Sequence, residues 1–167
     1  MEFAVSDKVV HPYHGPGVIT RIEQKEFMGG QERYYVIDIP DQGLTLYIPE
    51  SRMSITGVRP AMSDKQRRQV LDTLGGKPDQ LPEDHKERQE QVWEKLKTGE
   101  FTQVAETVRD LMWHEHQAHL TKKDSDYLDR ARKMLAAEIA LIDDCEVAEA
   151  NRIIEAIMAD TLAGAEA

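Results

Sequence analysis

The sequence predicts an α+β fold, in which a small, strongly bent β-sheet is followed by a compact bundle of about five helices. Two different patterns of apolar residues along the 167 residues lead to this prediction. Up to about residue 57, apolar and polar residues alternate between closely spaced turn signals, which is typical of short strands. After Pro60, apolar residues recur every three or four positions, which is typical of packed helices.

Four strands are predicted in the first part, at residues 7–11, 17–25, 33–39 and 44–48. Gly17 is expected to supply a positive φ before the second strand, and Gly29-Gly30 is expected to form a hairpin turn. Within the second strand, strict alternation places Val18 and Ile22 on one face and Ile19 on the other. Four short strands within 50 residues favour a small barrel of the SH3 or Tudor type.

The helical part divides at Gly, Pro and capping signals. Ser63 and Gln66 form a capping box, and Thr121 with Asp124 predicts the start of the fourth helix. The last helix is expected to fray after Ala163. The five predicted helices cover residues 63–75, 83–97, a segment with Val104, Val108, Leu111 and Met112 on one face, 121–142 and 147–163.

The charge balance excludes a protein that binds nucleic acid generally, through the phosphate backbone. With 21 Lys and Arg against 31 Asp and Glu, the net charge is −10, so nucleic acid repels the chain at long range. Any DNA contact must therefore be local and must be helped by a partner that holds the DNA. No signal peptide or membrane span is expected, and the single Cys145 is consistent with a cytoplasmic protein.

No catalytic site, metal site or cofactor site is predicted. The Gly15-Pro16-Gly17 segment lies between two strands, so it is interpreted as a turn and not as a phosphate-binding loop. A metal pair among His114, His116 and His119 is one hypothesis for the third helix. The favoured interpretation is that these histidines face solvent near the end of the helix, where the dipole favours a cation.

Four tyrosines in the first part offer a further hypothesis. An aromatic cage for a cationic ligand would use Tyr13, Tyr34, Tyr35 and Tyr47. The favoured alternative is that half of these rings pack in the core and half form cross-strand pairs on the surface.

Several stretches together resemble the CarD/CdnL family, whose N-terminal module is shared with the transcription-repair coupling factor. The opening Asp7-Lys8-Val9-Val10-His11-Pro12-Tyr13-His14-Gly15-Pro16-Gly17 carries the resemblance in the first part. In the helical part it continues through residues 94–99, 104–111 and 128–138. The similar segments follow one another in order over nearly the whole chain.

The resemblance implies a Tudor-like RNA-polymerase-interacting domain at residues 1–60 and a helical, DNA-facing domain at residues 61–167. It implies a non-enzymatic transcription regulator, associated with the nucleoid through RNA polymerase. Its expected partners are the polymerase β subunit and promoter DNA within the polymerase complex. There it would stabilise the open complex at the upstream edge of the bubble. The alternative is a polymerase-binding adaptor with little or no direct DNA contact.

The resemblance also implies particular contact residues. Lys25 and Tyr47 match the family positions that contact the polymerase, although Tyr47 replaces a more usual basic residue. His85 stands where the family carries a DNA-wedging Trp, with Lys86 and Arg88 as the basic residues that remain beside it. Trp93 is expected to pack, because the family has an apolar residue at that position.

Overall fold

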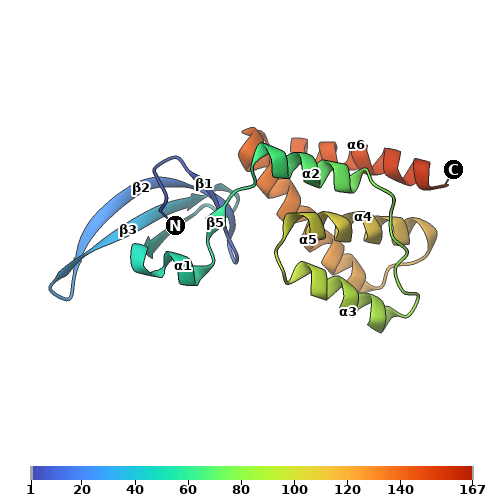
Figure 1. The fold of residues 1–167 in the computed structure, drawn as a ribbon, viewed down its shortest axis with the longest axis horizontal. Helices are drawn as coiled ribbons and strands as arrows, with labels where there is room; N and C mark the ends of the chain where they lie inside the picture. Colours follow the sequence, from blue (N-terminus) through green and yellow to red (C-terminus); the bar gives the residue numbers. More distant parts are fainter. Residues whose placement is uncertain (1, 167) are drawn as a thin grey trace. The chain divides into compact units, whose positions relative to one another are not determined.

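The computed structural model describes residues 2–166, which form two compact units. One unit comprises the residues up to Ala61 together with Leu141–Asp144. The other comprises Met62–Ala140 together with the residues from Cys145 onward. Figure 1 shows the β-sheet of the first unit and the helices of the second.

The first unit is a five-stranded antiparallel sheet in the order β4-β3-β2-β1-β5. Together with the helices of the second unit, it confirms the α+β fold class. The fifth strand is an addition to the four predicted ones, and it is only two residues long. The elements are β1 (Lys8–His11), β2 (Gly15–Phe27), β3 (Gly30–Ile39), η1 (Pro40–Gln42), β4 (Leu44–Pro49), η2 (Glu50–Arg52), α1 (Met53–Thr56) and β5 (Arg59–Pro60).

A β-bulge in β2 decides which side chains enter the core of the first unit. The register with β3 shifts between Ile19 and Arg21, so the alternation of faces is interrupted at Thr20. Ile19 is therefore fully buried, and Ile22, three residues later, packs against the same core. The predicted faces of this strand were wrong, because strict alternation would have placed these two side chains on opposite sides.

Glycine is required in the first β-hairpin for two different reasons. Gly15 has a φ of +87°, so it supplies the positive φ that was predicted for Gly17. Gly17 is needed for space, because a Cβ at this position would lie 2.5 Å from the carbonyl oxygen of Asp38 on β3. In the second hairpin the two turn residues are Met28 and Gly29, both with positive φ, and not Gly29-Gly30.

Among the described residues, the part of the chain after Ala61 forms five helices, as predicted, of which only the end of α5 belongs to the first unit. They are α2 (Asp64–Leu74), α3 (His85–Leu96), α4 (Phe101–Gln117), α5 (Lys122–Asp143) and α6 (Val147–Glu166). The capping box of Ser63 and Gln66 is present at the start of α2. Thr121 and Asp124 exchange backbone-to-side-chain hydrogen bonds at the start of α5. The predicted fraying after Ala163 was wrong, since α6 continues to Glu166.

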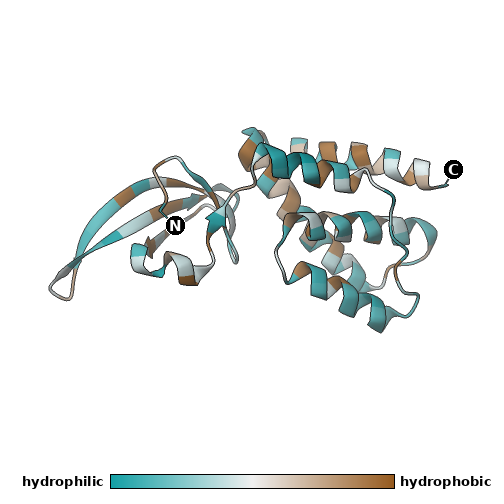
Figure 2. Cartoon of the chain, viewed as in Figure 1, coloured by the Kyte–Doolittle hydropathy of each residue, from teal (hydrophilic) through white to brown (hydrophobic). Residues whose placement is uncertain are grey.

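Each long helix buries one stripe of mostly apolar side chains between its neighbours. The fully buried members include Leu111 of α4, Leu135 and Ile139 of α5, and Ile154 of α6. In Figure 2, α3 is mostly hydrophilic, whereas α6 carries hydrophobic bands at helical intervals. Among the described residues, no helix combines the length and the apolar character that crossing a membrane requires.

Candidate functional site

Lys25 and Tyr47 meet on one face of the sheet, although they belong to different strands. The Nζ atom of Lys25 on β2 lies 4.4 Å from the ring centroid of Tyr47 on β4 and 5.8 Å from that of Tyr34 on β3. Arg21 donates a hydrogen bond to the Tyr47 hydroxyl at 3.3 Å, and Glu23 pairs with Arg21 at 2.9 Å. We call these five residues the sheet patch.

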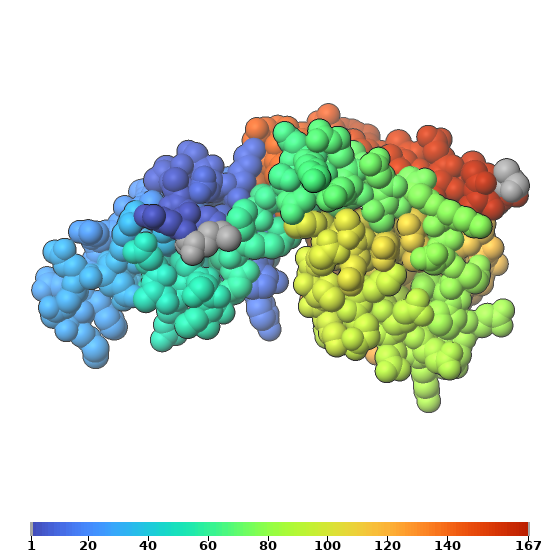
Figure 3. Space-filling view, viewed as in Figure 1, coloured from blue at the N-terminus to red at the C-terminus, as the bar shows by residue number. Residues whose placement is uncertain are grey.

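The sheet patch lies beside a free sheet edge. β4 is the terminal strand of the sheet, so its outer side has no β partner among residues 2–166. An edge strand of this kind presents unpaired N–H and C=O groups, to which a strand of another protein can pair. Tyr47 lies within this strand, and Lys25 lies near the tip of the β2–β3 hairpin, the light-blue projection in Figure 3. The patch and the edge together form a polar, partly aromatic surface.

The four tyrosines do not form an aromatic cage. Tyr35 is fully buried in the core, where it packs edge-on against Phe3. Tyr13 lies in the β1–β2 turn and is 89% exposed, with His14 as its aromatic neighbour. Only Tyr34 and Tyr47 share a surface, and the Lys25 amine already lies over them. The favoured alternative is therefore only partly right: Tyr35 alone packs in the core, Tyr34 and Tyr47 share the surface of the sheet, and Tyr13 belongs to neither group.

The start of α3 presents two of the three predicted DNA-contact residues to solvent. Asp84 caps the helix by accepting a hydrogen bond from the Glu87 backbone N–H at 3.0 Å. His85 and Lys86 follow in the first turn, and both are exposed. The acidic Glu87 in the same turn limits the positive potential that this end of the helix offers to a phosphate.

Arg88, the third predicted DNA-contact residue, is directed inward. Its side chain is 3% exposed, and its guanidinium forms a bidentate pair with Asp124 of α5 at 2.7 and 3.2 Å. The remaining donor bonds to the backbone carbonyls of Pro82 and Glu83 at 3.1 and 3.0 Å. Because every donor group of this side chain faces protein, Arg88 as placed here cannot contact DNA. Arg88 therefore connects α3 to α5 and does not belong to the predicted DNA-contact residues at the exposed start of α3.

The Arg88–Asp124 pair has a buried histidine as a neighbour. Burial alone would raise the pKa of Asp124, but hydrogen bonds from Arg88 and Thr121 outweigh it and hold the pKa below its ordinary value. Burial and the Arg88 cation lower the pKa of His114, against the opposing charges of Asp124 and Glu83. These groups stabilise a charged ion pair beside a neutral imidazole.

The three histidines of the α4 region have three different surroundings. His114 is 5% exposed, and its Nδ1 finds no hydrogen-bond partner among residues 2–166. The expectation that it faces solvent was wrong. His116 stacks on Trp113 and its Nε2 contacts the carboxylate of Glu166, while His119 is exposed in the loop after α4. Within the described part of the chain, no group of three or more His, Cys, Asp or Glu side chains is arranged to hold a metal ion.

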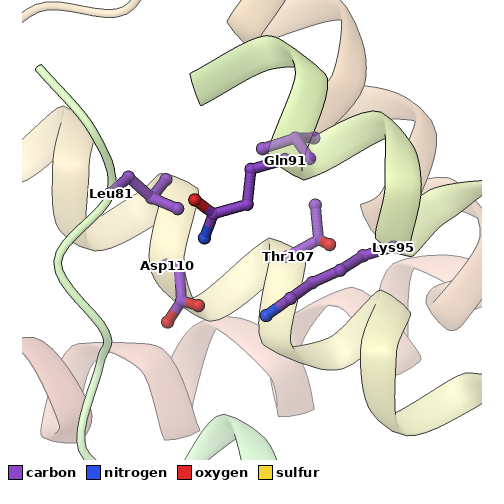
Figure 4. Close-up of a pocket in the computed structure, with 6 residues that line it drawn as sticks. Leu81, Gln91, Lys95, Thr107 and Asp110 are labelled. Atoms are coloured by element: carbon purple, nitrogen blue, oxygen red, sulfur yellow. The ribbon is translucent and has the colours of Figure 1, made fainter. Parts of the chain in front are cut away.

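Two of the hollows among the described residues lie in the second unit. Figure 4 shows the first, where Gln91 and Lys95 of α3 face Thr107 and Asp110 of α4, with Leu81 at one side. Its volume of about 10 Å³ is close to that of a single water and too small for a substrate. The second, of about 630 Å³, is open and lies between the loop after α2 and α6. Its lining includes Gly75, Gly76, Ile157 and Thr161, whose hydroxyl donates to the Leu74 carbonyl.

Comparison with known protein families shows which family this chain belongs to. The CarD-like/TRCF RID domain matches residues 3–62, and the C-terminal domain of CarD matches residues 69–155. The chain belongs to the CarD family. It is thereby related to transcription factors with an N-terminal β module and a helical C-terminal domain.

One relative of similar length agrees with this assignment. "Putative transcription factor YdeB" of Bacillus subtilis (strain 168) is 33% identical over 141 residues, which is 84% of this chain and 92% of that protein. The 72-residue N-terminal domain of Myxococcus xanthus CarD, solved by solution NMR, is 29% identical. The match covers 35% of this chain and 79% of that domain, with a TM-score of 0.31.

The sequence did not predict that Trp93 and Tyr127 form a partly exposed aromatic pair. Trp93 of α3 stacks on Tyr127 of α5, with ring centroids 6.3 Å apart and planes inclined by 25°. Trp93 remains 41% exposed, so its expected packing role is only partly fulfilled. Helical spacing offered a signal, because Arg88, Val92 and Leu96 occupy the buried stripe of α3 and Trp93 lies beside that stripe.

Proposed function

We propose that this CarD-family protein binds the β subunit of bacterial RNA polymerase and stabilises the open promoter complex at the upstream edge of the bubble. In this proposal the polymerase-interacting domain is residues 1–60 and the DNA-facing domain is residues 61–167. Neither part acts as an enzyme. The first unit anchors the protein to the polymerase, and the second unit then meets promoter DNA that the polymerase already holds.

The observation that carries the polymerase contact is a match to the RID domain on a sheet with a free edge. Residues 3–62 match that domain, and β4 ends the sheet. A strand of the β subunit pairing with β4 would gain backbone hydrogen bonds along its length, while Lys25 and Tyr47 would provide side-chain contacts. Tyr47 is half exposed, so the ring can bury apolar area in such a contact.

The charge of the chain supports DNA binding only within the polymerase complex. At a net charge of −10, the free protein gains little from phosphate neutralisation. Once anchored, however, its effective concentration near the DNA is high, and a few local contacts suffice. His85 and Lys86 supply such contacts at the exposed start of α3.

The polymerase contact is tested by titrating the full chain against a matched bacterial RNA polymerase. Lys25→Glu places a carboxylate beside Glu23 in the sheet patch and is expected to weaken binding by about 1 kcal/mol. Lys65→Glu, on the exposed side of α2, is the control because it changes the net charge equally. Equal affinities of the two variants would contradict the assignment of the sheet patch.

The alternative function is that of a polymerase-binding adaptor with little or no DNA contact. The inward direction of Arg88 favours it, because it removes one cation from the predicted DNA surface. The two functions differ in the lifetime of a preformed open complex after addition of a competitor. A regulator that contacts DNA prolongs this lifetime, whereas an adaptor leaves it unchanged even though it remains bound to the polymerase.

A further inference from the structure

Two histidines face each other in the turn that joins β1 to β2. The ring centroids of His11 and His14 lie 4.8 Å apart, with their planes inclined by 40°. Both residues are half-buried, whereas Tyr13 between them is exposed. Neither histidine belongs to the sheet patch or to the start of α3. We call residues 11–14 the histidine turn.

The Nδ1 atom of His11 holds the histidine turn closed. It accepts hydrogen bonds from the backbone N–H of Tyr13 at 3.0 Å and from that of His14 at 3.1 Å. An imidazole nitrogen accepts only while it carries no proton, so the closed turn requires a neutral His11 with its proton on Nε2. A proton on Nδ1 would direct a third N–H group at the other two. The closed turn and a protonated His11 therefore exclude each other.

His14 connects the histidine turn to the segment that precedes the free edge of the sheet. Its Nδ1 lies 3.3 Å from the side-chain oxygen Oε1 of Gln42 on η1. This oxygen only accepts, so the Nδ1–H of His14 is the donor, and protonation of His14 leaves this bond in place. η1 is followed by Gly43 and then by β4, the edge strand. The bond thus links the histidine turn to the beginning of that strand.

We propose that the histidine turn is a pH-sensitive switch of polymerase binding, in which protonation of His11 opens the turn and releases η1 at the start of β4. The inference rests on the proposed function and deepens it, because it adds a regulation of the same polymerase contact. Release of η1 gives the first residues of β4 more freedom, and a strand that has to be ordered before it pairs binds less tightly. Binding to polymerase therefore weakens as the pH falls.

The surroundings of His11 favour its neutral form. Burial, and then the neighbouring charge of His14, lower the pKa of His11 below its ordinary value of 6.5. In the open turn the ring is hydrated and its pKa returns toward that value. The open form therefore takes up a proton more readily than the closed form, and acid shifts the equilibrium toward opening.

The strands and the short helix around the histidine turn carry few charges. Residues 15–18 of β2, which pair with β1, have no charged side chain. The carboxylates on these elements oppose the lowered pKa of His11 and the arginine supports it, while burial and His14 decide its direction. The charged side chains are Asp38 of β3, Asp41 of η1 and Arg59 of β5.

The switch is tested by comparing the wild-type full chain with His11→Asn. The Oδ1 atom of asparagine and the Nδ1 atom of histidine are both bonded to Cγ, so the variant keeps an acceptor for the two N–H groups but does not titrate. Affinity for a matched bacterial RNA polymerase is measured at about pH 7.5 and about pH 6. Between these values wild type is expected to lose about twofold to fourfold more affinity than His11→Asn. Titration of the polymerase is common to both measurements and cancels.

Hydrogen exchange of the Tyr13 and His14 amides reports the opening of the turn without polymerase. Their protection, relative to the intrinsic exchange rate at each pH, is expected to fall about twofold to fourfold in wild type over the same interval. It is expected to stay constant in His11→Asn. His119→Asn removes an exposed histidine after α4 and is the matched control, which is expected to behave like wild type.

Two further variants sharpen the test. Gln42→Ala removes the bond to His14, so it is expected to keep the pH-dependent protection of the turn but to lose the pH-dependent part of polymerase binding that His11 causes. If His11→Asn proves unstable in thermal unfolding, His14→Ala takes its place. This variant removes the neighbouring charge, so the turn is expected to open at a higher pH than in wild type.

The outcomes separate the switch from the proposed function. Equal pH profiles of amide protection in wild type and His11→Asn would overturn the switch. A turn that opens with acid while the two polymerase affinities keep a constant ratio would overturn its control of binding. If wild type does not bind polymerase even at neutral pH, the proposed function fails, and amide protection still decides whether His11 opens the turn.

Discussion

Lys25 and Tyr47 lie on different strands of the first unit, separated by a hairpin, a whole strand and a turn, yet the Lys25 amine lies over the Tyr47 ring. Lys86 and Arg88 lie in one turn of α3, yet Lys86 is exposed and the Arg88 side chain is 3% exposed. A sheet gathers residues from distant positions on one face. A helix sends residues two positions apart to different sides. Predicted contact residues on different strands can therefore share one surface, whereas a run of them along a helix is divided between the surface and the interior.

The largest expected effect separates Lys86 from Arg88, the two basic residues near the start of α3. Arg88→Ala leaves the carboxylate of Asp124 buried without its main partner and is expected to lower the free energy of unfolding by about 3–5 kcal/mol. Lys86→Ala, on the exposed side of the same turn, is expected to change it by less than about 0.5 kcal/mol. Urea denaturation at neutral pH measures both. Similar stabilities of the two variants would mean that Arg88 is not held as described.

A second expected effect concerns the pH dependence of the helical unit. The pKa of His114 is lowered from its ordinary value of 6.5 by burial and by Arg88, while Asp124 and Glu83 oppose the shift. As the pH falls below 6.5, the unfolded chain takes up a proton before the folded one, so the free energy of unfolding decreases. The contribution of Asp124, whose pKa is also lowered, is lost only at more acidic pH.

Comparison of His114→Leu with wild type tests this pH dependence. Unfolding free energies are measured from neutral to mildly acidic pH. The variant is expected to lose less stability over this interval, because the unpaired Nδ1 and the titrating ring are both absent. His11 is common to both proteins, and its pKa is likewise lowered by burial and by His14, so its contribution cancels in the comparison. Parallel pH profiles would show that His114 does not respond as expected.

A smaller effect tests whether the sheet patch acts as a unit. Lys25→Ala and Tyr47→Ala are each expected to weaken polymerase binding by about 1 kcal/mol or less. The double variant is expected to lose less than the sum, because each substitution already removes the same cation–aromatic contact. Binding of the four proteins to polymerase gives the coupling free energy. Strict additivity would mean that the two residues contribute separately.

The smallest expected effect is at His85. The resemblance predicts that this residue takes the place of a family Trp, and an imidazole is a poorer wedge between bases than an indole. His85→Ala is expected to shorten the open-complex lifetime about twofold, and His85→Trp to lengthen it by a similar factor. The same lifetimes for wild type and both variants would assign DNA contact to other residues and remove His85 from the site.

Some features of the fold follow from interactions within a few residues. The capping boxes at Ser63 and Thr121 are visible in the sequence because their partners lie three positions ahead. The five helices follow from the period of their apolar residues in the same way. The bulge at Thr20 could not be predicted, because it depends on how β2 pairs with β3.

The α+β class, the change from strand to helix patterns, the helix caps and the acidic charge could be predicted from the sequence, since each depends on composition or on neighbours within one turn or strand. Three other features depend on the packing of the folded chain. This packing turned Arg88 toward Asp124, placed Lys25 over Tyr47 and stacked Trp93 on Tyr127. In each of these pairs the partners are distant in sequence. Their contact depends on helix packing and strand register, which no local pattern encodes.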